Sequence, residues 1–259
     1  KIAEMIISHK YKFIFIHCSK VAGSSIKVAL APYLGENDIV IGSLNEILDS
    51  GTSINKATKQ TFMTPKSICW ATVAKMIGKS NSESINIGVK AFYKNKLSKN
   101  PPHPTAQEIS AYFPQEWNKY FKFAFVRNPY EQVVSDYLWR KRKTGEDISF
   151  INYLKLVKNN KTISSIISSS AYYSNWKMIS INDQIVVDQI GKYENLEEDF
   201  LEIINHIGIN ANIKLSKQKN NPHNPQKENY KRFYGKEEKK LVDQLFQKEI
   251  FQLGYNFPY

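Results

Sequence analysis

The chain has 259 residues, 42% of them hydrophobic and 13% aromatic, so it can bury a substantial core, which excludes a disordered protein. Its net charge of +12 favours an anionic partner such as nucleic acid, an acidic membrane surface, or a phosphorylated or sulfated small molecule. No run of about 18 apolar residues is present, which excludes a membrane-spanning helix, and we expect no signal peptide. Cys18 and Cys69 have no metal-ligand spacing and are too few for a disulfide framework, so we expect a reducing, cytoplasmic compartment.

The first predicted element is a buried strand over residues 10–17, KYKFIFIH. It leads into a loop of small residues that contains Lys20 and Gly23, and a helix is predicted over residues 24–34. A helix N-terminus presents unpaired N–H groups and partial positive charge, so this junction suits a phosphate-like group. The lysine precedes the glycine, unlike the Walker A pattern, which disfavours a nucleoside triphosphatase or a nucleotide kinase. A tight turn with a solvated lysine is an alternative that the loop alone leaves open.

The middle of the chain is predicted to be mostly helical. Residues 43–100 carry helical patterns separated by polar loops, for example at 65–78. Thr105 is followed three residues later by Glu108, a capping box that marks the start of a helix. A second buried strand is then expected over residues 120–127, YFKFAFVR.

The second strand ends at Arg127, and a helix is predicted directly after it over residues 128–143. Ser135 lies eight residues after Arg127 and seven after Asn128. It is therefore on the same face of this helix as Asn128, the face toward the end of the strand. An arginine fork together with a hydroxyl suits a terminal phosphate. The alternative is that Arg127 pairs with a carboxylate such as Asp136 or Glu131.

Strand and helix patterns alternate along the chain, which predicts an α/β fold with a parallel sheet flanked by helices. We expect one domain over residues 1–259, with a mostly helical insertion at about residues 35–115. Ligands of such sheets bind beyond the carboxyl ends of the strands, so we expect the junctions after His17 and Val126 to bind one ligand with two anionic groups. Adenosine that carries a 5′-phosphosulfate and a 3′-phosphate fits this description. The remaining predicted elements are a strand at 184–194 and amphipathic helices at 194–208 and 236–255.

Two segments together resemble the sulfotransferase family. FIFIHCSKVAGSSI, from Phe13, is similar to its 5′-phosphosulfate loop, and FAFVRNPYEQVVSDY, from Phe123, is similar to its 3′-phosphate motif. GKYENLEEDF (191–200) is similar to a later family segment. The resemblance is closest to the carbohydrate sulfotransferase branch, which includes the heparan 2-O-sulfotransferases and short bacterial proteins. It implies a P-loop-NTPase-like fold and use of 3′-phosphoadenosine 5′-phosphosulfate (PAPS), with 3′,5′-adenosine bisphosphate as product.

The resemblance also implies roles for individual residues. Lys20 matches the loop lysine that contacts the transferring sulfuryl group and the leaving oxygen, and Arg127 and Ser135 match the 3′-phosphate pair. The loop departs from the usual pattern at Ser19, where proline is common, and at Val21, where the usual threonine hydroxyl is missing. The other residues expected to bind the cofactor are Val21, Ala22, Gly23, Ser24 and Ser25 at the 5′-phosphate, and Tyr230 and Lys231, with Lys227 nearby, in the late region that lies over the adenosine in the family.

Sulfuryl transfer to a hydroxyl needs a base for the acceptor proton, and His103 is the best candidate of five histidines. It precedes the Thr105 cap, so it lies near a helix N-terminus, whose positive end keeps the imidazole neutral. PPHPTAQEI is also similar to the segment that holds the catalytic histidine of the 2-O-sulfotransferases. The alternative for His103 is a surface position in a Pro-rich loop. We expect a structural role for His17, packing or a surface position for His206, and a loop position for His223.

These observations predict a PAPS-dependent sulfotransferase that modifies a hydroxyl of a carbohydrate or related small molecule by in-line displacement. Lys20 and His103 are the expected catalytic residues, and no metal is required if lysine and helix N–H groups neutralise the developing charge. The insertion is expected to contribute to the acceptor site. The alternative is a non-catalytic nucleic-acid-binding protein, but no helix-turn-helix, zinc or RNP pattern supports it, so no nucleic acid partner is expected.

Overall fold

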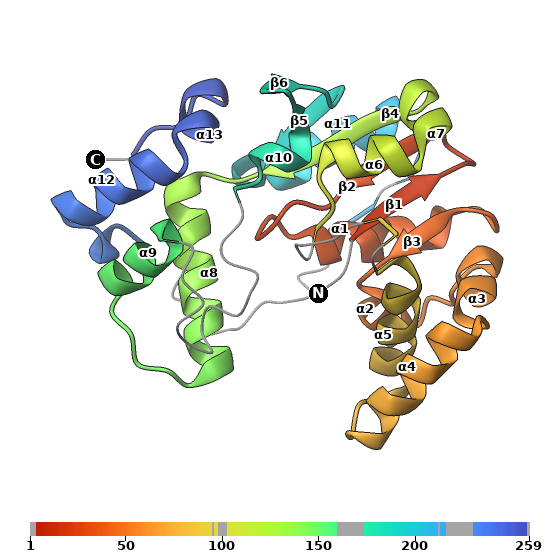
Figure 1. Cartoon of the computed structure of the whole chain (residues 1–259). Helices are drawn as coiled ribbons and strands as arrows, with labels where there is room; N and C mark the ends of the chain where they lie inside the picture. Colours follow the sequence, from red (N-terminus) through yellow and green to blue (C-terminus); the bar gives the residue numbers. More distant parts are fainter. Residues whose placement is uncertain are drawn as a thin grey trace. The chain divides into compact units, whose positions relative to one another are not determined.

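The structure is a computed structural model and describes residues 4–94, 96–97, 103–159, 174–211, 213–215 and 230–257 (Figure 1). The chain forms two compact units. The sheet unit consists of Lys1–Phe125 and Lys177–Lys219, and the helical unit consists of Val126–Trp176 and Asn220–Tyr259. Each unit is therefore built from two separate stretches of the chain.

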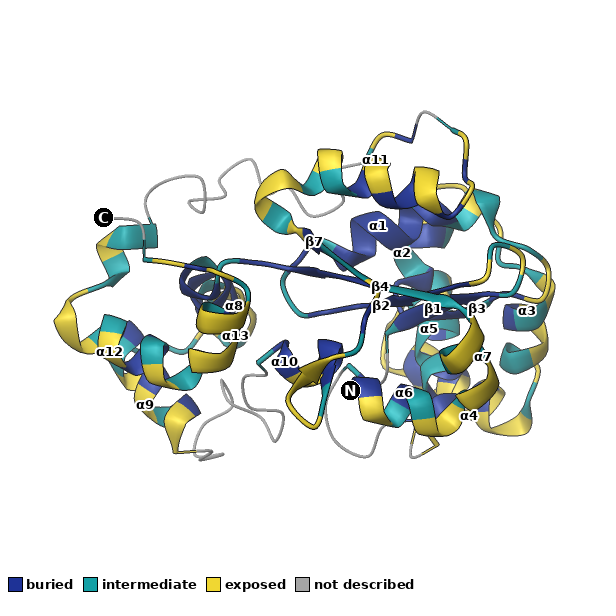
Figure 2. Ribbon diagram, turned by 90° about the horizontal axis from the view of Figure 1, so that it is seen from above, coloured by how far each residue is buried: buried dark blue, intermediate teal, exposed yellow. Residues whose placement is uncertain are grey.

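A mixed sheet forms the centre of the sheet unit. Within the described residues its five strands lie in the order β3-β1-β2-β4-β7. β1 is antiparallel to both β2 and β3, whereas β2 is parallel to β4, with Phe13 opposite Phe121. The side chains of β1 and β2 are all buried (Figure 2), and all of them are apolar except Ser8, whose hydroxyl donates to Asp38. The strands are β1 (Met5–Ser8), β2 (Phe13–Ile16), β3 (Ile39–Ile41), β4 (Phe121–Val126) and β7 (Gln189–Lys192).

The α/β fold class is confirmed, and the strands differ from the predicted ones in detail. The strand predicted at residues 10–17 begins only at Phe13, because the chain turns at Lys12, which has a φ of 56°. Neither β1 nor β3 was expected from the sequence, which predicts a parallel sheet. With these two strands at one edge, the sheet is mixed. The single strand predicted at 184–194 is wrong. Its first part is β6 (Gln184–Ile185), which forms a hairpin with β5 (Ser180–Ile181), and only its second part is β7.

The helical insertion between the first strand–helix unit and β4 is confirmed. Thr105 caps α6 through the predicted capping box, since its side chain accepts from Glu108 N and the Glu108 carboxylate accepts from Thr105 N. The helices of this part are α1 (Gly23–Leu30), the 3₁₀ turn η1 (Ala31–Tyr33), α2 (Leu44–Asp49), α3 (Lys56–Phe62), α4 (Pro65–Met76), α5 (Asn81–Tyr93), α6 (Ala106–Tyr112) and α7 (Pro114–Lys119). Later in the chain come α10 (Trp176–Ile179), the 3₁₀ turn η3 (Tyr193–Asn195) and α11 (Leu196–His206).

The helical unit packs around an aromatic core. Tyr137, Phe150 and Tyr153 are buried together in this core. Asn128 is the N-cap of α8, because its side chain accepts from Tyr130 N. The tail predicted as one helix is two helices, because the backbone leaves helical geometry at Phe246. The elements are α8 (Pro129–Thr144), α9 (Phe150–Lys158), the 3₁₀ turn η5 (Tyr230–Phe233), α12 (Lys236–Leu245) and α13 (Gln247–Gln252). Among the described residues, no helix is both long and apolar enough to cross a bilayer.

Candidate active site

The loop between β2 and α1 has the backbone of an anion-binding nest. Lys20 and Ala22 have positive φ angles of 64° and 60°, whereas Val21 between them and Gly23 after them do not. Alternation of this kind turns successive N–H groups toward one side of the chain, and it is strained for residues other than glycine. Ala22 occupies the N-cap of α1 without any side-chain acceptor, and the first turn holds no acidic residue. This loop and helix N-terminus are therefore suited to an anion.

The loop side chains are divided between the core and the loop surface. Val21 is completely buried, so its side chain belongs to the core. Ser24 Oγ lies 3.0 Å from Ser43 Oγ and 3.4 Å from Glu46 Oε1, and Ser25 is also buried. Lys20 is half-buried. Only Lys20 therefore brings a partly exposed charged side chain to the loop.

Gly23 is required because the ring of His17 lies against it. A Cβ at position 23 would be 2.0 Å from His17 Cδ2 and 2.1 Å from His17 Nε2, which no real contact permits. His17 follows the last residue of β2 directly, so the strand fixes its position. The predicted structural role of His17 agrees with this packing, and the ring also forms one wall of the loop.

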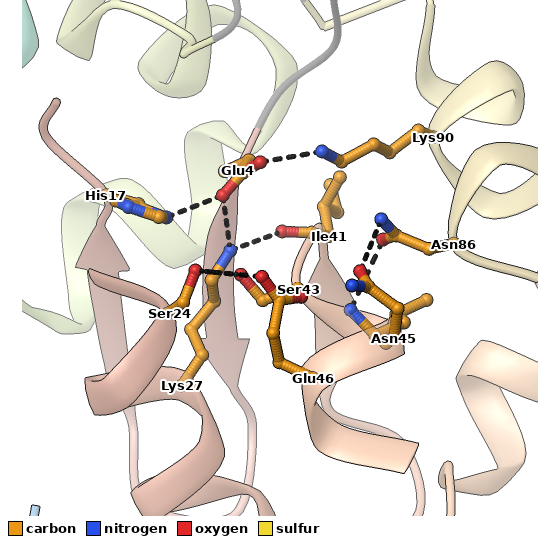
Figure 3. Close-up of polar contacts among 11 residues, drawn as sticks. Glu4, His17, Ser24, Lys27, Ile41, Ser43, Asn45, Glu46, Asn86 and Lys90 are labelled. Atoms are coloured by element: carbon orange, nitrogen blue, oxygen red, sulfur yellow. Dashed lines mark hydrogen bonds and ion pairs between the residues drawn. The ribbon is translucent and has the colours of Figure 1, made fainter. Parts of the chain in front are cut away.

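Glu4 connects this histidine with two lysines (Figure 3). Glu4 Oε2 lies 2.8 Å from His17 Nδ1 and 3.0 Å from Lys27 Nζ, and Glu4 Oε1 lies 2.6 Å from Lys90 Nζ. Burial alone would raise the pKa of Glu4, but Lys27, Lys90 and His17 hold the pKa of this carboxyl well below its usual value. Lys27 is completely buried, and burial lowers the pKa of its ammonium to about 8 although Glu4 opposes the change.

His103 lies beside His17 in the sheet unit. The two ring centroids are 4.9 Å apart, and His103 Nδ1 is buried with no hydrogen-bond partner among the residues that the structure describes. Burial first, and then the charge of His17, hold the pKa of His103 well below its usual value. The imidazole is therefore neutral at neutral pH and able to accept a proton.

Ligand atoms of Glu4, His17 and His103 lie within 4.8 Å of one another, so their spacing alone would permit a metal ion. Both oxygens of Glu4 already contact ammonium groups, from Lys27 and Lys90. A cation would enter between two positive charges and would have to displace at least one of them. We therefore assign this cluster no metal.

In the helical unit, Arg127 is buried and paired with Glu131. Its Nη2 and Nε atoms lie 3.1 Å and 3.3 Å from Glu131 Oε2, so one of the two carboxylates considered from sequence is its partner. The other, Asp136, instead accepts from Arg140 and from the hydroxyl of Tyr153. Ser135 is buried in the same helix.

The remaining predicted residues are distributed as follows. Tyr230 and Lys231 begin η5, where Tyr230 packs on the aromatic core and Lys231 is half-buried. His223 and Lys227 lie outside the described residues. His206 is exposed and its ring lies on Phe121, at 4.4 Å between centroids. Because Phe121 begins β4, His206 lies at the opposite end of the parallel strands from the loop.

Sequence reasoning missed Glu4, Lys27 and Lys90. They come from three segments that are far apart in the chain, and no short pattern connects them. The available signal was Lys27, which interrupts the apolar helical run IKVAL close to the loop. A lysine in the buried stripe of a helix requires an acidic partner.

A strand, a nest with a lysine and a helix N-terminus on an α/β sheet are typical of the class of proteins that bind phosphate-like groups through a P-loop-like turn. Within this class the chain belongs to the sulfotransferase family, whose model matches residues 3–256. It is thus a transferase of the PAPS-dependent class, which decides against the non-catalytic alternative. An uncharacterized protein of Archaeoglobus fulgidus is 35% identical over 91 residues, which make up 35% of this chain and 69% of that relative. No solved structure shows a significant match.

Proposed function

We propose that the protein transfers a sulfuryl group from PAPS to a hydroxyl of a carbohydrate or related small molecule, with His103 as the base. The observation that carries this proposal is the position of His103. Its buried Nδ1 has no partner among the described residues, and its ring contacts His17, which lies on the loop glycine. A neutral imidazole next to a phosphate-type loop is the arrangement that hydroxyl activation needs.

The nest and the N-terminus of α1 are proposed to hold the 5′-phosphosulfate. Backbone N–H groups from Val21 to Ser25 would bind the phosphate, and the hydroxyls of Ser24 and Ser25 would add donors. When bound, the donor supplies an activated sulfuryl group on a phosphate leaving group. The ammonium of Lys20 stabilises the charge that develops on the leaving oxygen.

Arg127 and Ser135 are proposed to bind the 3′-phosphate, with Tyr230 and Lys231 at the adenosine. The family motif supports the pair, and the fork of Arg127 is already held in place by Glu131. A phosphate would share this fork with the carboxylate of Glu131, which lowers the net positive charge that Arg127 offers. The family model spans both units, which supports treating the chain as one sulfotransferase domain.

In the transfer step the acceptor oxygen forms a bond to sulfur while the bond from sulfur to the phosphate oxygen breaks. His103 takes the hydroxyl proton, and the electron pair of the broken bond remains on the phosphate as 3′,5′-adenosine bisphosphate leaves. Placement and charge therefore supply most of the catalysis, as in phosphoryl transfer. The insertion is proposed to contribute to the acceptor site, because His103 lies within it.

The test compares nucleotide binding with transfer. 3′,5′-Adenosine bisphosphate at millimolar concentration should raise the melting temperature through preferential binding to the native state, and labelled sulfate should pass from PAPS to one acceptor in a panel of glycans, lipids and small alcohols. His103→Ala should keep the thermal shift and lose transfer. His206→Ala, at an exposed histidine remote from the loop, is the matched control and should keep both. Transfer by His103→Ala at the wild-type rate would remove His103 as the base.

A further inference from the structure

Helix α4 turns its large apolar side chains toward solvent. Met76 is 81% exposed, Ile77 at the end of the helix is 71% exposed, and Trp70 and Val73 are each 44% exposed. A surface helix normally buries residues of this size and exposes small or polar ones. In α4 the arrangement is reversed, because its buried residues are Ser67, Ala71 and Ala74.

The packing against α5 fixes this orientation. A Cβ on Gly88 of α5 would lie 2.6 Å from the carbonyl oxygen of Ser67 and 3.3 Å from the Cβ of Ala71, so the two helices are in close contact through small residues. Larger side chains could not enter this contact without separating the helices. The opposite side of α4, with yellow exposed positions in Figure 2, is here called the α4 outer face and consists of Cys69, Trp70, Val73, Met76 and Ile77. Their spacing of one, four, seven and eight residues places them on one side of the helix.

The α4 outer face belongs to a lysine-rich stretch of the chain. Not one acidic residue occurs between Lys56 and Ser82. The Lys94 ammonium lies 5.5 Å from the centre of the Trp70 ring. The lysines of this stretch, all exposed, are Lys56, Lys59, Lys66, Lys75 and Lys79, of which Lys79 pairs with Glu83 just beyond it, at 3.2 Å.

We infer that the α4 outer face docks on the surface of an anionic phospholipid bilayer. Apolar side chains with a tryptophan on a lysine-rich helix are the composition that lies in the headgroup region of a membrane. The lysines can keep their ammonium groups at the phosphates while their stems cover apolar surface. A second copy is a poorer occupant, since a two-fold contact through this face would bring its lysines against the same lysines of the partner.

The test uses the full chain and vesicles of phosphatidylcholine with or without about one third phosphatidylglycerol. Cys69 is exposed and Cys18 is completely buried, so a polarity-sensitive dye can be attached at Cys69 on the α4 outer face itself. We expect cosedimentation with the anionic vesicles, a blue shift of the dye, and much weaker binding to neutral vesicles or at high salt.

Two variants separate the apolar contribution from the charge. Met76→Ser with Ile77→Ser, and Lys66→Gln with Lys75→Gln, should each weaken binding by about tenfold or more. Both change exposed residues, so the thermal shift with 3′,5′-adenosine bisphosphate should stay as in the wild type. The matched control is Phe251→Ser with Lys236→Gln, which removes an apolar side chain that is 80% exposed and an exposed lysine from the helical unit and should not change binding.

Three results would overturn the inference. The first is no binding to anionic vesicles at millimolar lipid. The second is binding that the control variant weakens as much as the α4 variants do. The third is a stable dimer, found by light scattering and dissolved by Met76→Ser with Ile77→Ser, that shows no affinity for vesicles, because the outer face would then be a self-association surface.

Discussion

Glu4 is the residue through which the loop strand, the helix after the loop and the helical insertion are connected. Its carboxylate contacts His17, Lys27 and Lys90, which belong to three different segments. The charge of Glu4 also acts on His103, whose pKa it raises, so Glu4 influences the proposed base. Changes at Glu4 and at His17 should therefore alter the pKa of His103 in opposite directions.

The pH dependence of transfer tests whether changes at Glu4 and at His17 alter the pKa of His103 in opposite directions. His17→Gln removes a positive charge that lowers the pKa of His103, so the acid limb of kcat/KM should move to higher pH. Glu4→Gln removes a negative charge that raises this pKa, while the ammonium groups of Lys27 and Lys90 remain and lower it, so the limb should move to lower pH. Each shift should amount to about half a pH unit or more, read from pH–rate profiles. If the acid limb moved in the same direction in both variants, His103 could not be assigned as the base. A loss of rate that is equal at every pH would leave the position of the limb unchanged.

The pair of Arg127 and Glu131 gives a prediction about nucleotide affinity. Glu131→Gln removes the carboxylate that lies 3.1 Å from Nη2 of the fork, so 3′,5′-adenosine bisphosphate should bind about three- to tenfold more tightly, measured by calorimetry. Glu198→Gln, at an exposed position on α11, is the control and should leave the affinity unchanged. Weaker binding by Glu131→Gln would show that Glu131 is needed to orient Arg127 rather than to compete for it.

Elements with a local signal were predictable from the sequence, and those that depend on distant partners were not. The capping box of Thr105 and the Asn128 cap each lie within a few residues, and both are present as predicted. β1 is a four-residue strand whose pairing with β2 depends on a turn after Ser8, and β3 has only three residues. Such short strands exist because the neighbouring strands bury them, which local sequence does not report. The nest was predictable only as a loop, since Lys20 and Ala22 adopt positive φ without glycine.

The cap of α6 gives an element-scale prediction about the base. Thr105→Ala should destabilise the protein by about 1 kcal/mol and lower kcat, because the helix start that positions His103 is lost. Ser80→Ala removes the same type of capping box from α5, so it is a closely matched control. It should cost similar stability in urea unfolding while kcat is kept. An equal loss of kcat in both variants would mean that stability alone limits the activity.

At the scale of the whole molecule, the buried Lys27 links stability to pH. Its folded pKa of about 8 is lower than the unfolded value of 10.5, so the unfolded chain binds more protons between these values and stability due to Lys27 rises with pH there. Relative to Lys27→Met, the wild type should therefore gain on the order of 2 kcal/mol between about pH 8 and pH 10, measured by urea unfolding. Lys75→Met, at an exposed lysine, should show no such gain relative to the wild type. A constant difference between the wild type and Lys27→Met would contradict the depressed pKa.

The interleaving of the two units has a consequence for biosynthesis. β4 ends at Val126, but its neighbour β7 begins at Gln189, after the chain has passed through much of the helical unit. A ribosome adds roughly 5–20 residues per second, so a newly made β4 waits for several seconds with one edge unpaired. During this interval the nascent sheet is open to pairing with other chains. We therefore expect slower translation between these strands to lower the yield of folded protein, and chaperones that cover strand edges to restore it.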